Sequence, residues 1–396
     1  MEGAVDQDVR QPGCFHRPKR QKRASAAATL ALALTSALVA GCGGGSSGNP
    51  GGGGPPPPTF TNFDAPGAGT TSPQGTFGIG VTTNDNVVGY FIDAGGVVHG
   101  FVRTSVGAIA IVDAPGAATT PNNGTEVAAM NGSGEAVGYY SAPSGFLHSY
   151  LISSNGTMTE FDPPNASGSS ALCINDSGAI AGGVIDLNGN HGYVRTSDGT
   201  FTLIDPTGNP SGIKAVLPYG INANSAVAGV YIDASSVHHG FLRDANGTMT
   251  ILDAPGAGTA SNEGTEPVAI NASGVIVGGI NVGVINGVDT THSLIRNADG
   301  SYTVFDPPQA GAHSSFAEGI NDNGVVVGEY RDANLVRHGY LRQPNGTFTS
   351  FDDPDAAQLP LSNTNLGTVP RGINAGGAVA GLYSDANGVR HAFLWQ

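Results

Sequence analysis

The stretch EGINDNGVVVGEYRDANLVRHGYLRQPNGTFTSFD (residues 318–352) contains the pattern that decides the fold. It divides into four short apolar runs: EGIN (318–321), VVVGEY (325–330), HGYLR (338–342) and TFTSFD (347–352). Asp, Asn, Gly and Pro, which favour tight turns, separate the runs. Runs of this length, rich in Val, Thr and aromatic residues, predict four antiparallel strands joined by hairpins.

The same pattern recurs along the chain at intervals of 43 to 53 residues. An Asp ends the fourth run of each copy: Asp64, Asp113, Asp162, Asp205, Asp253, Asp306 and Asp352. A His begins the third run of each copy: His99, His148, His191, His239, His292, His338 and His391. An Asn ends the first run in six copies, and Thr82 takes its place in the first: Asn131, Asn175, Asn222, Asn271, Asn321 and Asn374. Repeats of this size, with four strands each, are typical of β-propellers.

The repeats predict an all-β fold, a seven-bladed β-propeller of four-stranded antiparallel blades. Their phase adds a second expectation. The repeat region opens at Thr59 with a strand of the fourth type and ends at Gln396 just after one of the third type, HAFLWQ (391–396). The N-terminal strand should therefore pair into the last blade and close the ring, which hides both free edges. An open or differently closed stack is the alternative.

Composition agrees with a turn-rich β protein. Gly is 62 of 396 residues and charged residues are only 12%, which disfavours helical bundles and coiled coils. The residue before the Ile of the first run is small in every copy: Gly80, Ala129, Cys173, Gly220, Ala269, Gly319 and Gly372. If the first strands are innermost, small side chains leave room where they converge. This interpretation makes Cys173 a packing residue.

The N-terminus predicts export. A basic stretch (17–23) precedes an apolar one (24–40), which ends in Leu38-Val39-Ala40-Gly41-Cys42 and resembles a bacterial lipobox. We therefore expect a lipoprotein signal peptide over 1–41, lipid attachment at Cys42, a flexible Gly/Pro-rich tether over 42–58 and the propeller over 59–396. The expected location is the bacterial cell envelope, at the outer membrane or cell surface rather than the inner membrane.

Charge limits the partners. Net charge is −15, and residues after 41 contain 10 Lys/Arg against 28 Asp/Glu. Such an acidic surface repels phosphates, so we expect no nucleic-acid partner and membrane contact through the lipid alone. Three Cys are too few for a disulfide framework. We expect a monomer without metal or cofactor.

The third run of the last copy, His391-Ala392-Phe393-Leu394-Trp395, is similar to the signature of the HAF-type extracellular repeat family. HGFVR (99–103), HGFLR (239–243) and HGYLR (338–342) are variants of it. The resemblance extends over residues 59–396. It implies an exported bacterial protein with propeller-like repeats, and it implies no activity.

The repeated His and Asp admit two interpretations. They could form metal sites or acid–base pairs. However, a set present in every blade cannot converge on one substrate, so we favour His–Asp hydrogen bonds that fix the turn of each blade. An Arg follows five of these His by four residues and shares a strand face with the His: Arg103, Arg195, Arg243, Arg296 and Arg342. We expect these arginines to pair with an Asp or Glu, and anion binding is the alternative.

Function should lie where the copies differ. Three residues before the repeated Asn, the copies hold Ile79, Ala128, Leu172, Tyr219, Val268, Glu318 and Arg371. Tyr219, Glu318 and Arg371 are the candidate ligand-binding residues near the channel mouth, and a salt bridge between blades is the alternative for the last two. No residue is singled out as catalytic.

The leading hypothesis is a non-catalytic, lipid-anchored propeller that binds an envelope protein or glycan. The second is a propeller enzyme, a lyase or hydrolase acting at the channel mouth. The third is a purely structural envelope repeat protein. A pocket lined by unrepeated polar residues would favour an enzyme, and a filled channel with a flat face would favour a binding role.

Overall fold

The computed structural model describes residues 58–208, 212–285, 288–311, 314–358 and 367–396. The predicted signal peptide, Cys42 and the tether up to residue 57 lie outside the described residues. Every named element in these ranges is a β-strand. In the same ranges, no helix is long and apolar enough to cross a membrane.

The strands form four-stranded antiparallel units in which each strand pairs with the next. The first units contain β2 (Gly75–Val81), β3 (Val87–Ile92), β4 (Val98–Arg103) and β5 (Ile109–Val112); β6 (Thr125–Met130), β7 (Ala136–Ser141), β8 (Leu147–Ile152) and β9 (Met158–Phe161); and β10 (Gly168–Ile174), β11 (Ile180–Ile185), β12 (Asn190–Arg195) and β13 (Phe201–Ile204). The next contain β14 (Ile213–Ile221), β15 (Val227–Asp233), β16 (His238–Arg243) and β17 (Met249–Leu252); and β18 (Gly264–Ile270), β19 (Ile276–Ile285), β20 (Val288–Arg296) and β21 (Tyr302–Phe305). The last contain β22 (Ser315–Ile320), β23 (Val326–Arg331), β24 (Arg337–Arg342) and β25 (Phe348–Phe351); and β26 (Gly367–Ile373), β27 (Val379–Ser384) and β28 (Arg390–Trp395) with β1 (Phe60–Phe63).

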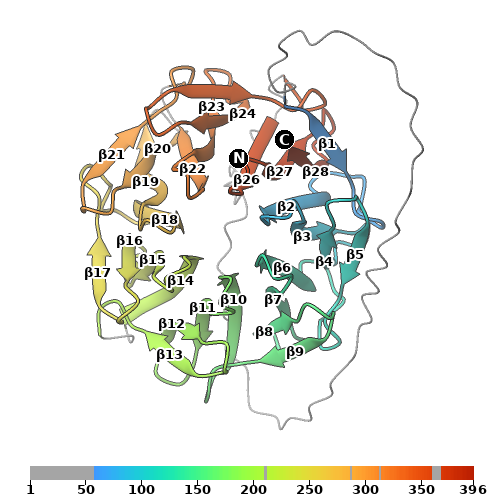
Figure 1. The fold of residues 1–396 in the computed structure, drawn as a ribbon, viewed down its shortest axis with the longest axis vertical. Helices are drawn as coiled ribbons and strands as arrows, with labels where there is room; N and C mark the ends of the chain where they lie inside the picture. Colours follow the sequence, from blue (N-terminus) through green and yellow to red (C-terminus); the bar gives the residue numbers. More distant parts are fainter. Residues whose placement is uncertain (1–57, 209–211, 286–287, 312–313, 359–366) are drawn as a thin grey trace, which may run out of the picture.

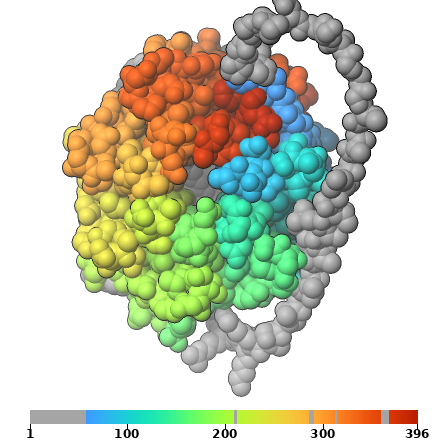
Figure 2. Space-filling model, in the orientation of Figure 1, coloured from blue at the N-terminus to red at the C-terminus, as the bar shows by residue number. Residues whose placement is uncertain are grey.

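The units are arranged in a circle around a central opening (Figure 1). The first strands, such as β2, β6 and β14, face the opening, and the fourth strands, such as β9 and β17, lie at the outer rim. Within each unit the chain therefore passes from the centre to the outer rim, and a long loop then leads back to the first strand of the next unit. Seen from the same side, the molecular surface is hollowed at its middle (Figure 2).

The first and last strands of the described chain pair with each other. β1 is antiparallel to β28, with Phe60 opposite Trp395 and Phe63 opposite Ala392. The Phe60 ring packs edge-on against Phe393, with ring centroids 5.3 Å apart. This pairing is the one that the phase of the repeats predicted, and it leaves β28 without a free edge.

Apolar cores lie between neighbouring units. One contains Val88 and Val102 of the β2–β5 unit together with Val127 and Tyr150 of the β6–β9 unit. Each unit therefore buries its faces against the units beside it. Burial of this kind contributes roughly 25 cal/mol per Å² of apolar surface, so the contacts between neighbouring units stabilise the fold.

Glycine is required where two units meet at the start of an inner strand. Gly75 and Gly367 have φ values of +122° and +117°. A Cβ on either would lie 2.0 Å from the carbonyl oxygen of Arg390 or Arg337, respectively. Only glycine accepts both this conformation and this approach, so part of the glycine content is fixed by the contacts between units.

A chain of asparagine hydrogen bonds links the units at the other end of the inner strands. The Nδ2 of each repeated Asn donates to the backbone carbonyl at the same position of the next unit, for example Asn175 to Asn222 over 2.9 Å and Asn222 to Asn271 over 3.1 Å. The last member, Asn374, donates to the carbonyl of Thr82 over 2.8 Å. The sequence marked these Asn residues as repeated, but gave no indication that they bind across units.

Candidate functional site

The repeated His and Asp form a pair in every unit. The His Nδ1 lies 2.8–2.9 Å from a carboxylate oxygen of the Asp that ends the fourth strand in six units, and His191 bonds Asp205 in the same way. The pair of the last unit joins His391 of β28 to Asp64, which follows β1. The hydrogen bond with Asp64 raises the pKa of His391, and that with Asp352 raises the pKa of His338.

In five units a second Asp lies beside the other nitrogen of the imidazole, with its carboxylate 3.4–3.9 Å from the His Nε2. An aromatic ring from the second strand stacks on the imidazole, as Tyr231 does on His239 with centroids 4.8 Å apart. Each imidazole is thus held in place by its own unit. Among the described residues, no group of three or more His, Cys, Asp or Glu could hold a metal ion.

A β-bulge interrupts every inner strand at the same position of the repeat, and β14 has a second irregularity between Ile213 and Ala215. The pairing of first and second strands shifts between Gly78 and Gly80, and between Ala317 and Gly319, and likewise in the other units. The skipped residues are Ile79, Ala128, Leu172, Tyr219, Val268, Glu318 and Arg371. A bulge bends its strand and redirects a side chain. The side chains at these seven positions therefore point in a different direction from those of the paired residues beside them.

All seven bulge residues line one central cavity of about 490 Å³. Its size is that of a small-molecule site. The residue after each bulge is the small one noted in the sequence, and there the inner strands come close: a Cβ on Gly372 would lie 3.4 Å from the Cα of Gly80. Small side chains therefore let the strands converge, while the bulge residues fill or line the space between them.

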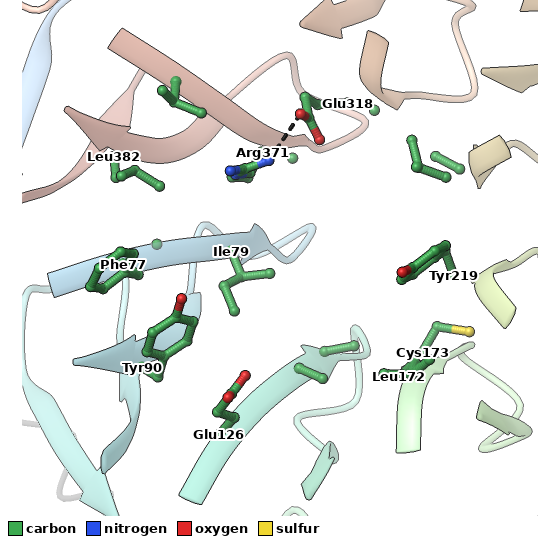
Figure 3. A pocket seen from close by; sticks show the side chains of 18 of the residues that line it. Phe77, Ile79, Tyr90, Glu126, Leu172, Cys173, Tyr219, Glu318, Arg371 and Leu382 are labelled. Atoms are coloured by element: carbon green, nitrogen blue, oxygen red, sulfur yellow. Dashed lines mark hydrogen bonds and ion pairs between the residues drawn. The ribbon is translucent and has the colours of Figure 1, made fainter. Parts of the chain in front are cut away.

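The structure brings Glu318 and Arg371 together from adjacent units. Arg371 Nη1 donates to Glu318 Oε1 over 2.9 Å, which is the salt bridge between blades considered as the alternative role. The Glu318 side chain is buried, whereas that of Arg371 is 26% exposed. Tyr219 points into the same opening from another strand (Figure 3). The three candidates thus line one cavity, and Arg371 keeps part of its surface exposed while paired with Glu318.

Glu126 of β6 forms a further polar group in this cavity. Its Oε2 accepts a hydrogen bond of 2.7 Å from the hydroxyl of Tyr139 on β7. Burial raises the pKa of the Glu126 carboxyl, and the Tyr139 hydrogen bond opposes this effect. Burial and the nearby Glu126 raise the pKa of Tyr139 well above its usual range, so its phenol stays protonated and donates.

Arg337 and Arg390 also line the cavity. They precede the repeated His, where the other units hold Val98, Leu147, Asn190, His238 and Thr291. Arg337 lies 3.4 Å from Glu329, and Arg390 donates to the hydroxyl of Ser384. Sequence analysis missed both, although their departure from the repeat was a usable signal.

The expectation of carboxylate partners for the Arg residues after the repeated His was wrong for three of them. Arg103 lies over the Phe63 ring at 4.8 Å, and Arg342 lies over Phe305 at the same distance. Arg195 lies 4.9 Å from the centre of the Phe161 ring. Each ring belongs to the fourth strand of the preceding unit, so these arginines stabilise contacts between units through cation–π interactions.

Cys173 also lines the cavity but is buried, with its sulfur 3.6 Å from the carbonyl oxygen of Pro218. Burial raises the pKa of its thiol to about 12. The thiol is therefore neutral at physiological pH and acts in packing rather than as a nucleophile.

Four-stranded antiparallel units around a central opening define the β-propeller class, and solved structures agree. Virginiamycin B lyase from Staphylococcus aureus is similar with a TM-score of 0.52 and 15% identity over 86% of this chain and 99% of that chain. The BP39L lectin from Burkholderia pseudomallei is similar with a TM-score of 0.50 and 11% identity over 81% and 95% of the two chains. At such identities the likeness shows the fold alone. No family model and no curated protein matches the chain.

Proposed function

We propose that this chain is a lipid-anchored envelope protein that binds a small glycan or peptide ligand in the central cavity of a β-propeller. One observation carries this proposal: the bulge position, which is redirected into the cavity in every unit, holds a different residue in each. A position that only supported the repeat would carry the same residue in every copy, as the His and Asp positions do.

The proposal includes the closed, seven-bladed form of the ring. It is supported by the pairing of β1 with β28, by the His391–Asp64 pair that joins the same two segments, and by the asparagine hydrogen bonds between successive units. A closed ring keeps the inner strands at fixed positions, which a cavity made by all of them requires.

The binding test compares the wild-type chain with an Ala128→Trp variant, whose indole would occupy the cavity from the bulge of β6. The panel consists of neutral oligosaccharides, uronic acids and short peptides, measured by isothermal titration calorimetry. At least one class should bind the wild type and fail to bind Ala128→Trp. Ala298→Trp, in an exposed turn, is the control and should bind normally. Binding by Ala128→Trp equal to the wild type would contradict the proposal.

A catalytic role is the second candidate, favoured by Glu126. Burial raises the pKa of the Glu126 carboxyl, which favours its protonated form and suits a general acid. A lyase or hydrolase would then use the same cavity. Turnover of the bound compound by the wild type, with loss of turnover but not of binding in Glu126→Asp, would establish catalysis. Recovery of unchanged compound would exclude it for that compound.

The lipid anchor and the membership in the HAF-type repeat family rest on sequence: the lipobox-like stretch ending at Cys42 and the seven His-initiated strands. Metabolic labelling with radioactive palmitate should mark the wild-type chain and leave Cys42→Ser unlabelled. Equal labelling of both chains would refute the anchor without affecting the cavity.

A further inference from the structure

Three arginines and two glutamates line the central cavity, and one of the glutamates, Glu318, is paired with Arg371. Arg337 of β24, Arg371 of β26 and Arg390 of β28 belong to two adjacent units, whereas Glu126 belongs to the unit of β6. Glu126 and Arg371 point toward the same opening from different strands (Figure 3). The cavity thus has an arginine-rich wall and a separate acidic group.

The acidic group is set among aromatic rings. Tyr139 donates to Glu126, and Phe77 and Tyr90, which stack with centroids 4.6 Å apart, line the cavity as well. Tyr90 and Tyr219 lie near enough to add to the raised pKa of Tyr139, after burial and Glu126, so their hydroxyl groups share this region of the cavity. A carboxylate beside aromatic faces suits an ammonium group, which gains from both charge and cation–π attraction.

The arginine-rich wall is notable in so acidic a protein. Residues after 41 contain ten Lys/Arg, and three of them line this cavity. Arg371 pairs with Glu318, Arg337 pairs with Glu329, and Arg390 donates a hydrogen bond to the Ser384 hydroxyl. A planar guanidinium matches a carboxylate in a bidentate manner, so this wall suits the anionic end of a ligand.

Apolar bulge residues lie between these walls, among them Ile79, Leu172 and Val268. We propose that the central cavity binds a zwitterion, an α-amino acid or a short peptide with free termini, with its ammonium at Glu126 and its carboxylate at Arg371 and Arg390. This inference rests on the proposed function, because it names the ligand class of the same cavity.

Binding should also change the protonation of Glu126. Its carboxyl is partly protonated near its raised pKa, because burial disfavours the charge. A ligand ammonium favours the ionised form, so binding at a pH near that value releases a proton. The release appears as a dependence of the calorimetric enthalpy on the ionisation enthalpy of the buffer.

The experiment titrates the full chain with three free dipeptides, Gly-Gly, Ala-Leu and Leu-Ala, and with the N-acetyl and C-amide forms of each. At least one free dipeptide should bind with proton release. Either blocking group should weaken it about tenfold or more, the scale of one lost charge-assisted hydrogen bond. Glu126→Gln should remove both the proton release and the preference for a free amine. Glu318→Gln/Arg371→Gln, which removes both partners and leaves no unpaired buried charge, should remove the preference for a free carboxylate.

Glu160→Gln is the matched control, since Glu160 is exposed on β9 of the same unit as Glu126, and it should bind as the wild type does. Binding of N-acetylated and free dipeptides with equal affinity, or no binding of any free dipeptide, would overturn the zwitterion proposal. If oligosaccharides bind in that case and Ala128→Trp abolishes their binding, the cavity proposal stands and only the ligand class is wrong.

Discussion

The Asn and bulge positions are three residues apart in the same inner strands, but the residue is nearly constant at the first position and different in every unit at the second. The Asn position holds Asn in every unit but the first, and its side chain bonds the next unit. The bulge position holds seven different residues that face one cavity. The difference separates the repeated contacts that join neighbouring units from the variable residues that line the cavity.

Among changes to the contacts that join the units, removal of β1 should reduce stability the most. Deleting residues 59–64 takes Phe60 away from Phe393 and Asp64 away from His391. Loss of the apolar burial of Phe60 and Phe63, at about 1.5–3 kcal/mol for a fully buried side chain, together with an unpaired β28 edge, should cost several kcal/mol. Urea unfolding measures this loss. A deletion of six residues within the predicted tether (42–58) should leave the midpoint unchanged, and an equal effect of both deletions would contradict the closing role of β1.

The asparagine chain should give the next largest effect. Asn222 is buried, donates to Asn271 O and accepts from the backbone N–H groups of Asn224 and Ala226. Asn222→Leu loses these bonds and leaves their partners unsatisfied, so it should destabilise the protein by about 2–4 kcal/mol. Denaturant titration tests the value. A loss below about 0.5 kcal/mol would show that the asparagine chain does not hold the units together.

The first unit offers the converse test, because it has Thr82 where the others have Asn. Asn84 donates to Gly132 O over 3.2 Å, but units that have the repeated Asn contain the equivalent bond as well, for example from Asn224 to Ala272 O. Thr82→Asn should supply the missing donor toward Asn131 O and stabilise the protein by about 1 kcal/mol. Thr82→Val is the control and should give no gain. A lower unfolding midpoint for Thr82→Asn than for Thr82→Val would contradict this account.

The His–Asp pairs predict a smaller, pH-dependent effect. His391 is flanked by Asp64 and Asp385, with Asp353 nearby, and its pKa is raised by these acids. Because the folded-state pKa exceeds the unfolded value of about 6.5, the stabilisation is complete below that pH and declines as the pH rises through the raised pKa. The unfolding midpoint of His391→Gln should therefore fall less than that of the wild type between pH 6 and 8. Parallel pH profiles would contradict this prediction.

The repeats contained most of the information on the fold. Strand order, hairpin turns and the pairing of β1 with β28 follow from apolar runs and their phase, because these depend on local pattern and on the need to cover edges. The cavity could be predicted only in part. Tyr219, Glu318 and Arg371 stood out by departing from the repeat.

Arg337 and Arg390 also depart from the repeat, but the fact that they line one cavity with Glu126 and Tyr139 depends on which strands face each other across the opening, and no local pattern fixes that. Phe63 and Arg103 illustrate the same limit. Alternation placed Arg103 on the correct face of its strand, but its partner is an aromatic ring of the preceding unit and not a carboxylate. Which residues meet between two units depends on how all the units are arranged, and not on the sequence pattern of one strand.

The most direct test of the central claim is a paired measurement of stability and dipeptide binding on Glu126→Gln. Burial raises the pKa of this carboxyl, so the ionised form is disfavoured in the folded state and the side chain lowers stability as the pH rises above its unfolded pKa. The account predicts that Glu126→Gln at pH 7 is at least as stable as the wild type and loses the preference for a free amine. A lower unfolding midpoint together with unchanged binding would contradict the account, because Glu126 would then stabilise the fold and have no role in ligand binding.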